Sequence, residues 1–170
     1  LENTGSSINI NMTYEDITDY KTKNYIIETL KHRKDLARNV NFEITETENI
    51  ENYKAVKEFI REVKEFGSLI FIDDFGTGYS NFEKIIELDI DVIKIDGSII
   101  KKIENKKYRY LIKNIKDLGK NLGIKIVAEH VETSKIQEEV KKMGIEMSQG
   151  YFIGKPTEKI NTNKIRQNIN

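Results

Sequence analysis

Polar residues that suit metal or phosphate chemistry follow the short apolar segments of this chain. The most conspicuous are Asp73 and Asp74, which end an apolar run and precede Gly76 and Gly78. The whole set, in chain order, is Asn11, Glu43, Asp73, Asp74, Lys94, Asp96, Glu129, Glu132 and Gln149. Carboxylate and amide oxygens are hard ligands that suit Mg²⁺ or Mn²⁺. With two histidines and no cysteine in the chain, a zinc site is not expected.

A cluster of these acids would need cations to hold it together. Several carboxylates at one edge repel one another unless positive charge lies between them. Two divalent ions that clamp a phosphodiester would remove the repulsion and activate a water molecule. Lys94 would hold that water, or a phosphate oxygen, as a compact charge. Taken singly, each polar residue is better explained as a cap, a turn or a solvated strand end. The recurrence at six successive apolar segments favours the metal site.

The residues between these positions repeat one order of elements, namely a helical pattern, a glycine and a short apolar strand. Tyr53 to Val63 has helical spacing, Gly67 ends it, and Leu69 to Ile72 is apolar throughout, as in a strand buried on both faces. The repeat predicts strands at 8–12, 40–45, 69–72, 91–95, 125–128 and 146–149. It predicts helices at 17–36, more weakly, and at 53–63, 82–86, 108–122 and 133–143. Ser80 and Thr133 are the expected caps, and Phe82, Ile85 and Ile86 are expected to face inward.

Strands that alternate with helices indicate an α/β fold with a parallel sheet. The alternatives are an open doubly wound sheet and a (β/α)8 barrel. Six strands are too few to close the barrel, which typically takes ~250 residues, so the strand count alone mildly favours the open sheet. The carboxyl ends of barrel strands are where active sites are built, and the polar residues above lie at these ends.

Composition limits the classes of partner. The 170 residues are enough for one domain, and 28 basic residues balance 28 acidic ones, which argues against binding a nucleic-acid polymer through bulk charge. No apolar run approaches the roughly 20 residues of a membrane span. The absence of cysteine fits a cytoplasmic protein. Because the chain begins with Leu1, we expect a fragment or processed form, whose parent could be membrane-anchored. Residues 157–170 read as a polar tail.

Five ordered segments resemble successive motifs of the EAL domain family. They are FEITET at 42–47, IDDFGTGYSN at 72–81, DVIKIDGSII at 91–100, IVAEHVET at 126–133 and SQGYFIGKP at 148–156. INMTYEDI at 10–17 is similar to the strand that carries the family's ligand asparagine. The resemblance covers residues 8–156 and implies an incomplete, TIM-like (β/α)8 barrel of about six units, in a domain spanning residues 1–156.

The resemblance implies a cyclic-di-GMP phosphodiesterase that cuts one phosphodiester to give linear pGpG, using two Mg²⁺ or Mn²⁺ ions. The implied metal ligands are Asn11, Glu43, Asp73, Asp74 and Glu129. Lys94 would bind the attacking water, and Glu129 would serve as a ligand or as general base through water.

Five further residues receive supporting roles from the same resemblance. Glu132 and Gln149 would hold the metal-site and water network. Glu46 would order the loop that carries the two adjacent acids. Asp96 and Pro156 are expected to contact the substrate.

Two departures from the family pattern bear on activity. No Glu-Ala-Leu tripeptide occurs, and the chain begins near the third strand of the expected barrel, so two units and one metal ligand would be missing. We therefore expect this chain alone to be impaired or inactive, and its two unpaired sheet edges to favour a homodimer. His130 stands where the family usually has glycine, beside Glu129, where it either alters the pocket or points away.

Three other functions compete with the phosphodiesterase. A catalytically inactive module that binds or senses cyclic di-GMP is the main alternative, although such a module would be free to lose the acids and Lys94. An unrelated metal-dependent barrel enzyme would not need these motifs in this order. A purely structural interaction domain leaves the carboxylates unexplained.

Overall fold

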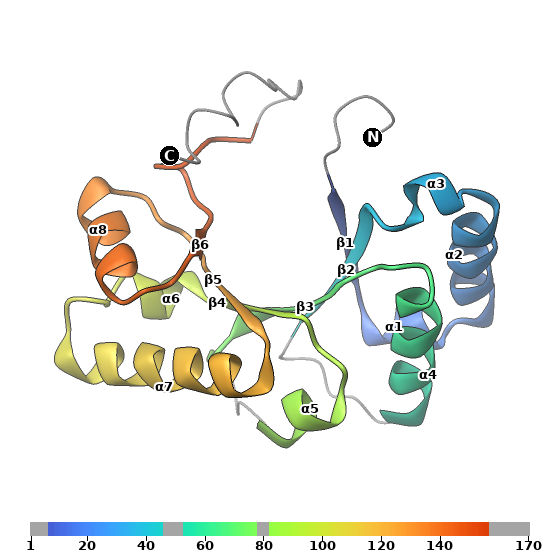
Figure 1. The fold of residues 1–170 in the computed structure, drawn as a ribbon, viewed down its shortest axis with the longest axis horizontal. Coiled ribbons are helices and arrows are strands. Elements are labelled where there is room, and N and C mark those ends of the chain that lie inside the picture. Colours follow the sequence, from blue (N-terminus) through green and yellow to red (C-terminus); the bar gives the residue numbers. More distant parts are fainter. Residues whose placement is uncertain (1–6, 46–52, 78–81, 157–170) are drawn as a thin grey trace.

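One sheet of six parallel strands forms the centre of the molecule, and its spatial order follows the chain from β1 to β6 (Figure 1). The computed structural model describes residues 7–45, 53–77 and 82–156. The strands are β1 (Ile8–Met12), β2 (Val40–Thr45), β3 (Ile70–Phe75), β4 (Val92–Ile95), β5 (Lys125–Ala128) and β6 (Met147–Ser148). The predicted parallel α/β fold with six strands is confirmed.

Helices cover the convex face of the curved sheet (Figure 1). They are α1 (Tyr14–Thr18), α2 (Tyr20–His32), α3 (Lys34–Ala37), α4 (Tyr53–Lys64), α5 (Phe82–Glu87), α6 (Gly97–Ile100), α7 (Lys106–Leu122) and α8 (Ser134–Lys142). The weak helical pattern predicted at 17–36 is divided among the first three. Asp19 ends α1 and caps α2 by accepting a hydrogen bond from the Thr22 amide, because a side chain that satisfies a free amide favours a new helix start.

The apolar core lies between the sheet and the helices. Successive side chains of a strand point to opposite faces, so Phe42 and Ile44 of β2 turn toward the helices while Glu43 turns away. Phe42 packs edge-to-face on Phe59 of α4, with ring centroids 5.3 Å apart. Both rings are fully buried, and this contact ties α4 to β2.

The helix ends follow the predicted chemistry. Gly67, Gly123 and Gly144 have φ angles of 87°, 72° and 70°, in the left-handed region that glycine adopts without a steric cost. Thr133 caps α8 by accepting a hydrogen bond from the Ile136 amide. Ser80 lies outside the described residues.

Two local expectations are corrected. Ile85 is buried as predicted, but Ile86 is 67% exposed, because the short helix α5 turns adjacent residues to different faces. The strand predicted to begin at Asp91 begins at Val92, although the Asp91 amide donates to Ile70 O at 3.0 Å and the Asp91 carbonyl accepts from the Lys125 amide at 2.9 Å. The Asp91 carboxylate also accepts a hydrogen bond from the Ile70 amide at 2.8 Å and pairs with Lys64 at 3.0 Å, which joins the start of β3 to the end of α4.

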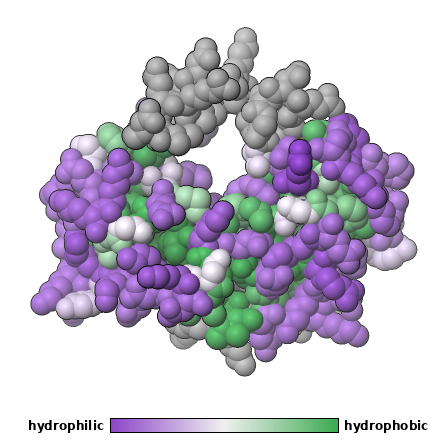
Figure 2. All heavy atoms as spheres, in the orientation of Figure 1, coloured by the Kyte–Doolittle hydropathy of each residue, from purple (hydrophilic) through white to green (hydrophobic). Residues whose placement is uncertain are grey.

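The barrel is incomplete. Among the described strands, β1 and β6 each pair on one side, and the molecule is hollowed between the β1 side and the β6 side (Figure 2). Ile8 and Ile10 of β1 are 41% and 38% exposed. None of the described helices has the length and apolar character needed to cross a membrane.

Candidate active site

Four neighbouring strands bring polar side chains together at their carboxyl ends. Glu43 comes from β2, Asp73 from β3, Lys94 from β4, and Glu129 directly follows β5. The parallel register places Thr45 beside Asp73, so neighbouring strands end at similar heights. Glu43, Lys94 and Glu129 are buried, and Asp73 is partly buried. The structure therefore joins four residues that lie up to 86 positions apart in the sequence.

Lys94 lies at the centre of this group. Its Nζ is 3.0 Å from Glu43 Oε2, 2.8 Å from Asp73 Oδ1 and 2.9 Å from Glu129 Oε1. Burial alone would lower the pKa of Lys94, but the hydrogen bonds to the three carboxylates outweigh it and raise the pKa above its ordinary value. The ammonium therefore stays charged and holds the three carboxylates together.

For the pKa of Glu129, the effect of burial outweighs that of the ion pair. Burial raises its pKa, and the attraction of Lys94 only partly offsets this effect. The negative charge of Asp73 raises the pKa further. A carboxylate of raised pKa is a stronger base, which suits a group that must accept a proton.

Asp74 lies beside this group in a strained conformation. Its φ of 55° is uncommon for a residue with a side chain, and the pairing of β3 with β4 shifts register between Ile72 and Phe75. The Asp74 amide donates to Asp73 Oδ1 at 3.0 Å. Burial and the nearby charges of Asp73 and Asp96 raise the pKa of Asp74. The bulge thus turns two successive carboxylates toward one site.

The donor set fits a hard divalent cation. Asp73, Asp74 and Glu129 each offer an oxygen, and these oxygens lie within 4.8 Å of one another. Oxygen ligands alone, with neither imidazole nor thiolate among them, suit Mg²⁺ or Mn²⁺. These three carboxylates are among the predicted ligands, and burial together with the charge of Asp73 raises the pKa values of Asp74 and Glu129.

Two asparagines of β1 share the face that meets Glu43. Asn11, the predicted ligand, is exposed and lies opposite Glu43 in the register. The contact itself comes from Asn9, whose Nδ2 donates to Glu43 Oε1 at 2.5 Å and whose Oδ1 accepts from Asn41 at 3.0 Å. Sequence reasoning missed Asn9, although its spacing of two residues from Asn11 places both on one face.

A pocket of about 450 Å³ opens beside Glu129. Glu132, Gln149 and Pro156 line it, as does His130. Glu132 pairs with Lys101 at 3.1 Å, whereas the ion pairs of Lys94 are with Glu43, Asp73 and Glu129. The structure therefore places these predicted residues next to the carboxylate cluster and outside its ion pairs.

Asp96, another predicted residue, makes a hydrogen bond outside the ion pairs of the cluster. Asp96 caps α6 by accepting from the Ser98 amide at 2.8 Å, which gives it a structural role, and its substrate contact stays a prediction. Burial alone would raise the pKa of Asp96, but the hydrogen bonds from Ser98 lower it overall. Glu46 lies outside the described residues.

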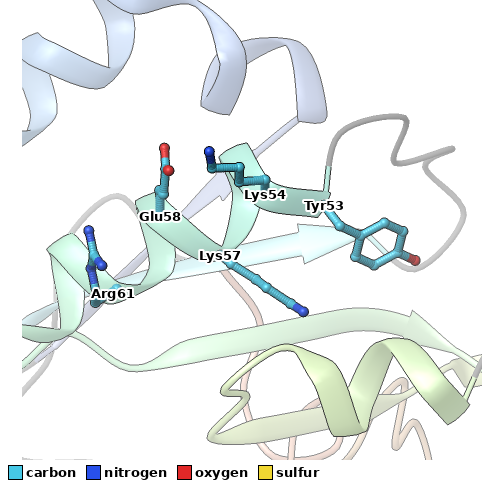
Figure 3. A pocket seen from close by; sticks show the side chains of 5 residues that line it. All are labelled: Tyr53, Lys54, Lys57, Glu58 and Arg61. Carbon is cyan, nitrogen blue, oxygen red and sulfur yellow. The ribbon is translucent and has the colours of Figure 1, made fainter.

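A second pocket, of about 400 Å³, lies on α4 (Figure 3). Its lining comes from one helix and consists of Tyr53, Lys54, Lys57, Glu58 and Arg61. None of these was predicted as a site residue, and Lys57 pairs with Glu87 at 2.9 Å. The charges on this surface are explained as a solvated helix face.

The chain belongs to the EAL domain family, whose profile matches residues 1–156. It is 42% identical over 115 residues to the probable cyclic di-GMP phosphodiesterase PdeA of Escherichia coli K12. That match covers 67% of this chain and 16% of the relative, so the chain spans only a small part of the curated protein.

Two solved structures support the same assignment. The EAL domain protein of Listeria monocytogenes EGD-e is 26% identical, with a TM-score of 0.79, and the match covers 96% of this chain and 64% of that one. The PaMucR phosphodiesterase in a c-di-GMP complex is 28% identical, with a TM-score of 0.80, and the match covers 89% of this chain and 68% of that one. The incomplete barrel therefore has the EAL fold over the strands present.

Proposed function

We propose that this chain carries a metal-dependent phosphodiesterase site that hydrolyses cyclic di-GMP to linear pGpG. The observation that carries the proposal is the buried Lys94 among Glu43, Asp73 and Glu129 at the carboxyl ends of four strands. The adjacent Asp74 adds a further oxygen. Curated relatives are named as cyclic di-GMP phosphodiesterases, and PaMucR was solved with c-di-GMP, which supports this substrate.

The carboxylates give the site its binding function. Asp73, Asp74 and Glu129 would hold two Mg²⁺ or Mn²⁺ ions, with Glu43 and Asn11 as further ligands. Ions bound there would neutralise the phosphodiester and lower the pKa of a bound water. Lys94 would orient that water, or a phosphate oxygen, because an ammonium is a compact donor with three hydrogens.

The reaction requires one attack and two proton transfers. The water oxygen bonds to phosphorus, and the bond from phosphorus to a ribose 3′ oxygen breaks, which opens the ring. Glu129 would take the proton of the water, directly or through a second water, since its pKa is raised. The departing 3′ oxygen would receive a proton from solvent.

The open side of the barrel limits the rate that we expect. Because β1 and β6 are not paired with each other, a bound substrate would be open to water on that side, which would weaken the electrostatic interactions made with it. We therefore expect turnover by these 170 residues alone to be low.

The test is chromatographic analysis of products from cyclic di-GMP with Mg²⁺ or Mn²⁺. Linear pGpG is expected, with none in EDTA, and Glu43→Ala should lower the rate at least about 100-fold, because electrostatic groups of an active site contribute about this much. Binding of cyclic di-GMP without any pGpG, by a folded native chain, would instead favour an inactive sensor.

We also infer that two copies associate through the sheet edges. Within the described residues no strand pairs with the outer edge of β1, and Ile8 and Ile10 beside it are exposed. The proposed compartment is the cytoplasm, which the absence of cysteine fits.

A further inference from the structure

His130 has a backbone conformation that its side chain makes costly. Its φ is 52°, and only Asp74 shares a positive φ among the described residues other than glycine. Such positions are uncommon for residues with a Cβ, and they cluster at ligand sites, where the surroundings enforce them. The residue follows Glu129 directly, so the strain lies next to the carboxylate cluster.

The imidazole lies over Gly97, the first residue of α6. A Cβ at Gly97 would be 2.5 Å from His130 Cβ and Cγ and 2.6 Å from Nδ1, closer than real side chains come. The ring therefore occupies the space that Gly97 leaves. It is exposed, and none of the hydrogen bonds and ion pairs found among the described side chains involves it.

The imidazole ring lies at the pocket beside Glu129. His130 lines the pocket with Glu129 and Gln149, and its ring lies against Gly97. It therefore lies at the carboxyl ends of β4, β5 and β6. A substrate phosphate bound through divalent ions on Asp73, Asp74 and Glu129 would meet the imidazole at the mouth of the pocket.

We infer that His130 contacts the substrate by donating an imidazole hydrogen bond to a phosphate oxygen of the cyclic dinucleotide. This inference rests on the proposed function of the site. The His130 imidazole packs against Gly97 and has a free N–H donor at the edge of the proposed phosphate site. The donor therefore gains a hydrogen-bond partner when substrate binds. A purely structural ring would fill the space over Gly97 and leave substrate affinity unchanged.

Two replacements of His130 distinguish the loss of its N–H donor from the release of its backbone strain. His130→Gly removes the ring and adopts the observed φ freely, so the variant should melt at or above the temperature of the native chain. His130→Asn tolerates the same φ and keeps an N–H donor. Calorimetric titration of cyclic di-GMP with Ca²⁺ in place of Mg²⁺ gives the affinity, and chromatography confirms that the ligand stays intact.

We expect His130→Gly to raise the Kd about ten-fold, since one lost hydrogen bond is worth about this factor. His130→Asn should stay within about three-fold of the native value. Unchanged affinity in both variants overturns the substrate contact. Equal losses in both overturn the hydrogen bond, because the ring itself would then be the binding element. A folded native chain that binds no cyclic di-GMP overturns the proposed function, and this inference falls with it.

A second pair of variants tests the position of the ring. Gly97→Ala forces His130 to move, and its backbone needs no positive φ. We expect Gly97→Ala to weaken binding in the native background and to have no further effect in His130→Gly. Equal effects of Gly97→Ala in the two backgrounds would show that the loss does not pass through His130, and would contradict the inference.

Discussion

At the scale of single residues, the site depends on one cation that balances three buried anions. Lys94 has a side chain only 6% exposed, and the Glu43 and Glu129 side chains are 10% and 6% exposed. A buried charge that loses its partner is expensive, because neither water nor protein compensates it. Lys94 should therefore matter for folding as well as for chemistry.

Lys94→Met keeps the length of the side chain and removes the charge. In EDTA at neutral pH we expect the free energy of unfolding to fall by about 3–5 kcal/mol, the usual cost of breaking a buried pair. Urea denaturation followed by circular dichroism measures this change. Lys57→Met, which breaks the exposed pair with Glu87, should change stability by less than about 1 kcal/mol. Equal effects of the two variants would show that Lys94 is not a structural charge.

We expect Asp74→Asn to weaken the proposed metal site and to raise the stability of the fold. The pKa of Asp74 is raised in the fold, so this group favours folding below the ordinary carboxyl pKa and loses that contribution as the pH rises through the folded value. Asparagine carries no charge and tolerates the φ of 55°. In EDTA at pH 7.5, the variant should melt at or above the native temperature.

Two further observations would check the origin of that difference. The advantage of Asp74→Asn should shrink as the pH is lowered toward the ordinary carboxyl pKa of about 4, because the native Asp74 carboxyl, whose pKa is raised, has taken up its proton by then. Mg²⁺ should raise the melting temperature of the native chain more than that of the variant. An advantage that is independent of pH would exclude charge repulsion as the cause.

At the scale of elements, sequence patterns located the strands because each strand is short, apolar and followed by a polar residue. They located Glu43, Asp73, Lys94 and Glu129 because parallel strands end at one rim. Asn9 was missed, since nothing in the spacing distinguishes it from Asn11 as the partner of Glu43. The break at Asp19 was missed as well, because a cap inside a helical pattern competes with continuation of the helix.

The contact between α4 and β2 should carry much of the stability of the rim. Phe59→Ala removes a fully buried ring that packs on Phe42, beside Glu43 in sequence. We expect a loss of about 3–5 kcal/mol in the free energy of unfolding, as for other buried phenylalanines. Ile86→Ala, at a residue 67% exposed, should cost less than about 0.5 kcal/mol. A small loss for Phe59→Ala in thermal or urea denaturation would mean that α4 is not anchored there.

At the scale of the whole molecule, the open barrel is the feature that decides assembly. A charged residue at an exposed strand edge opposes pairing with another chain. Ile10→Lys should therefore convert a dimer into a monomer in size-exclusion chromatography with light scattering, with the circular dichroism spectrum unchanged. A native chain that is already monomeric at every concentration would contradict the proposed association.

The central claim is that the carboxylates around Lys94 form a metal-dependent phosphodiesterase site, and the rate of pGpG formation tests it most directly. The native chain with Mn²⁺ should form pGpG, and Asp73→Asn should lower the rate at least about 100-fold. Asp89→Asn, the same change at a side chain 78% exposed, should keep the native rate. Loss of activity in Asp89→Asn alone, or pGpG formation that survives both Asp73→Asn and EDTA, would contradict the account.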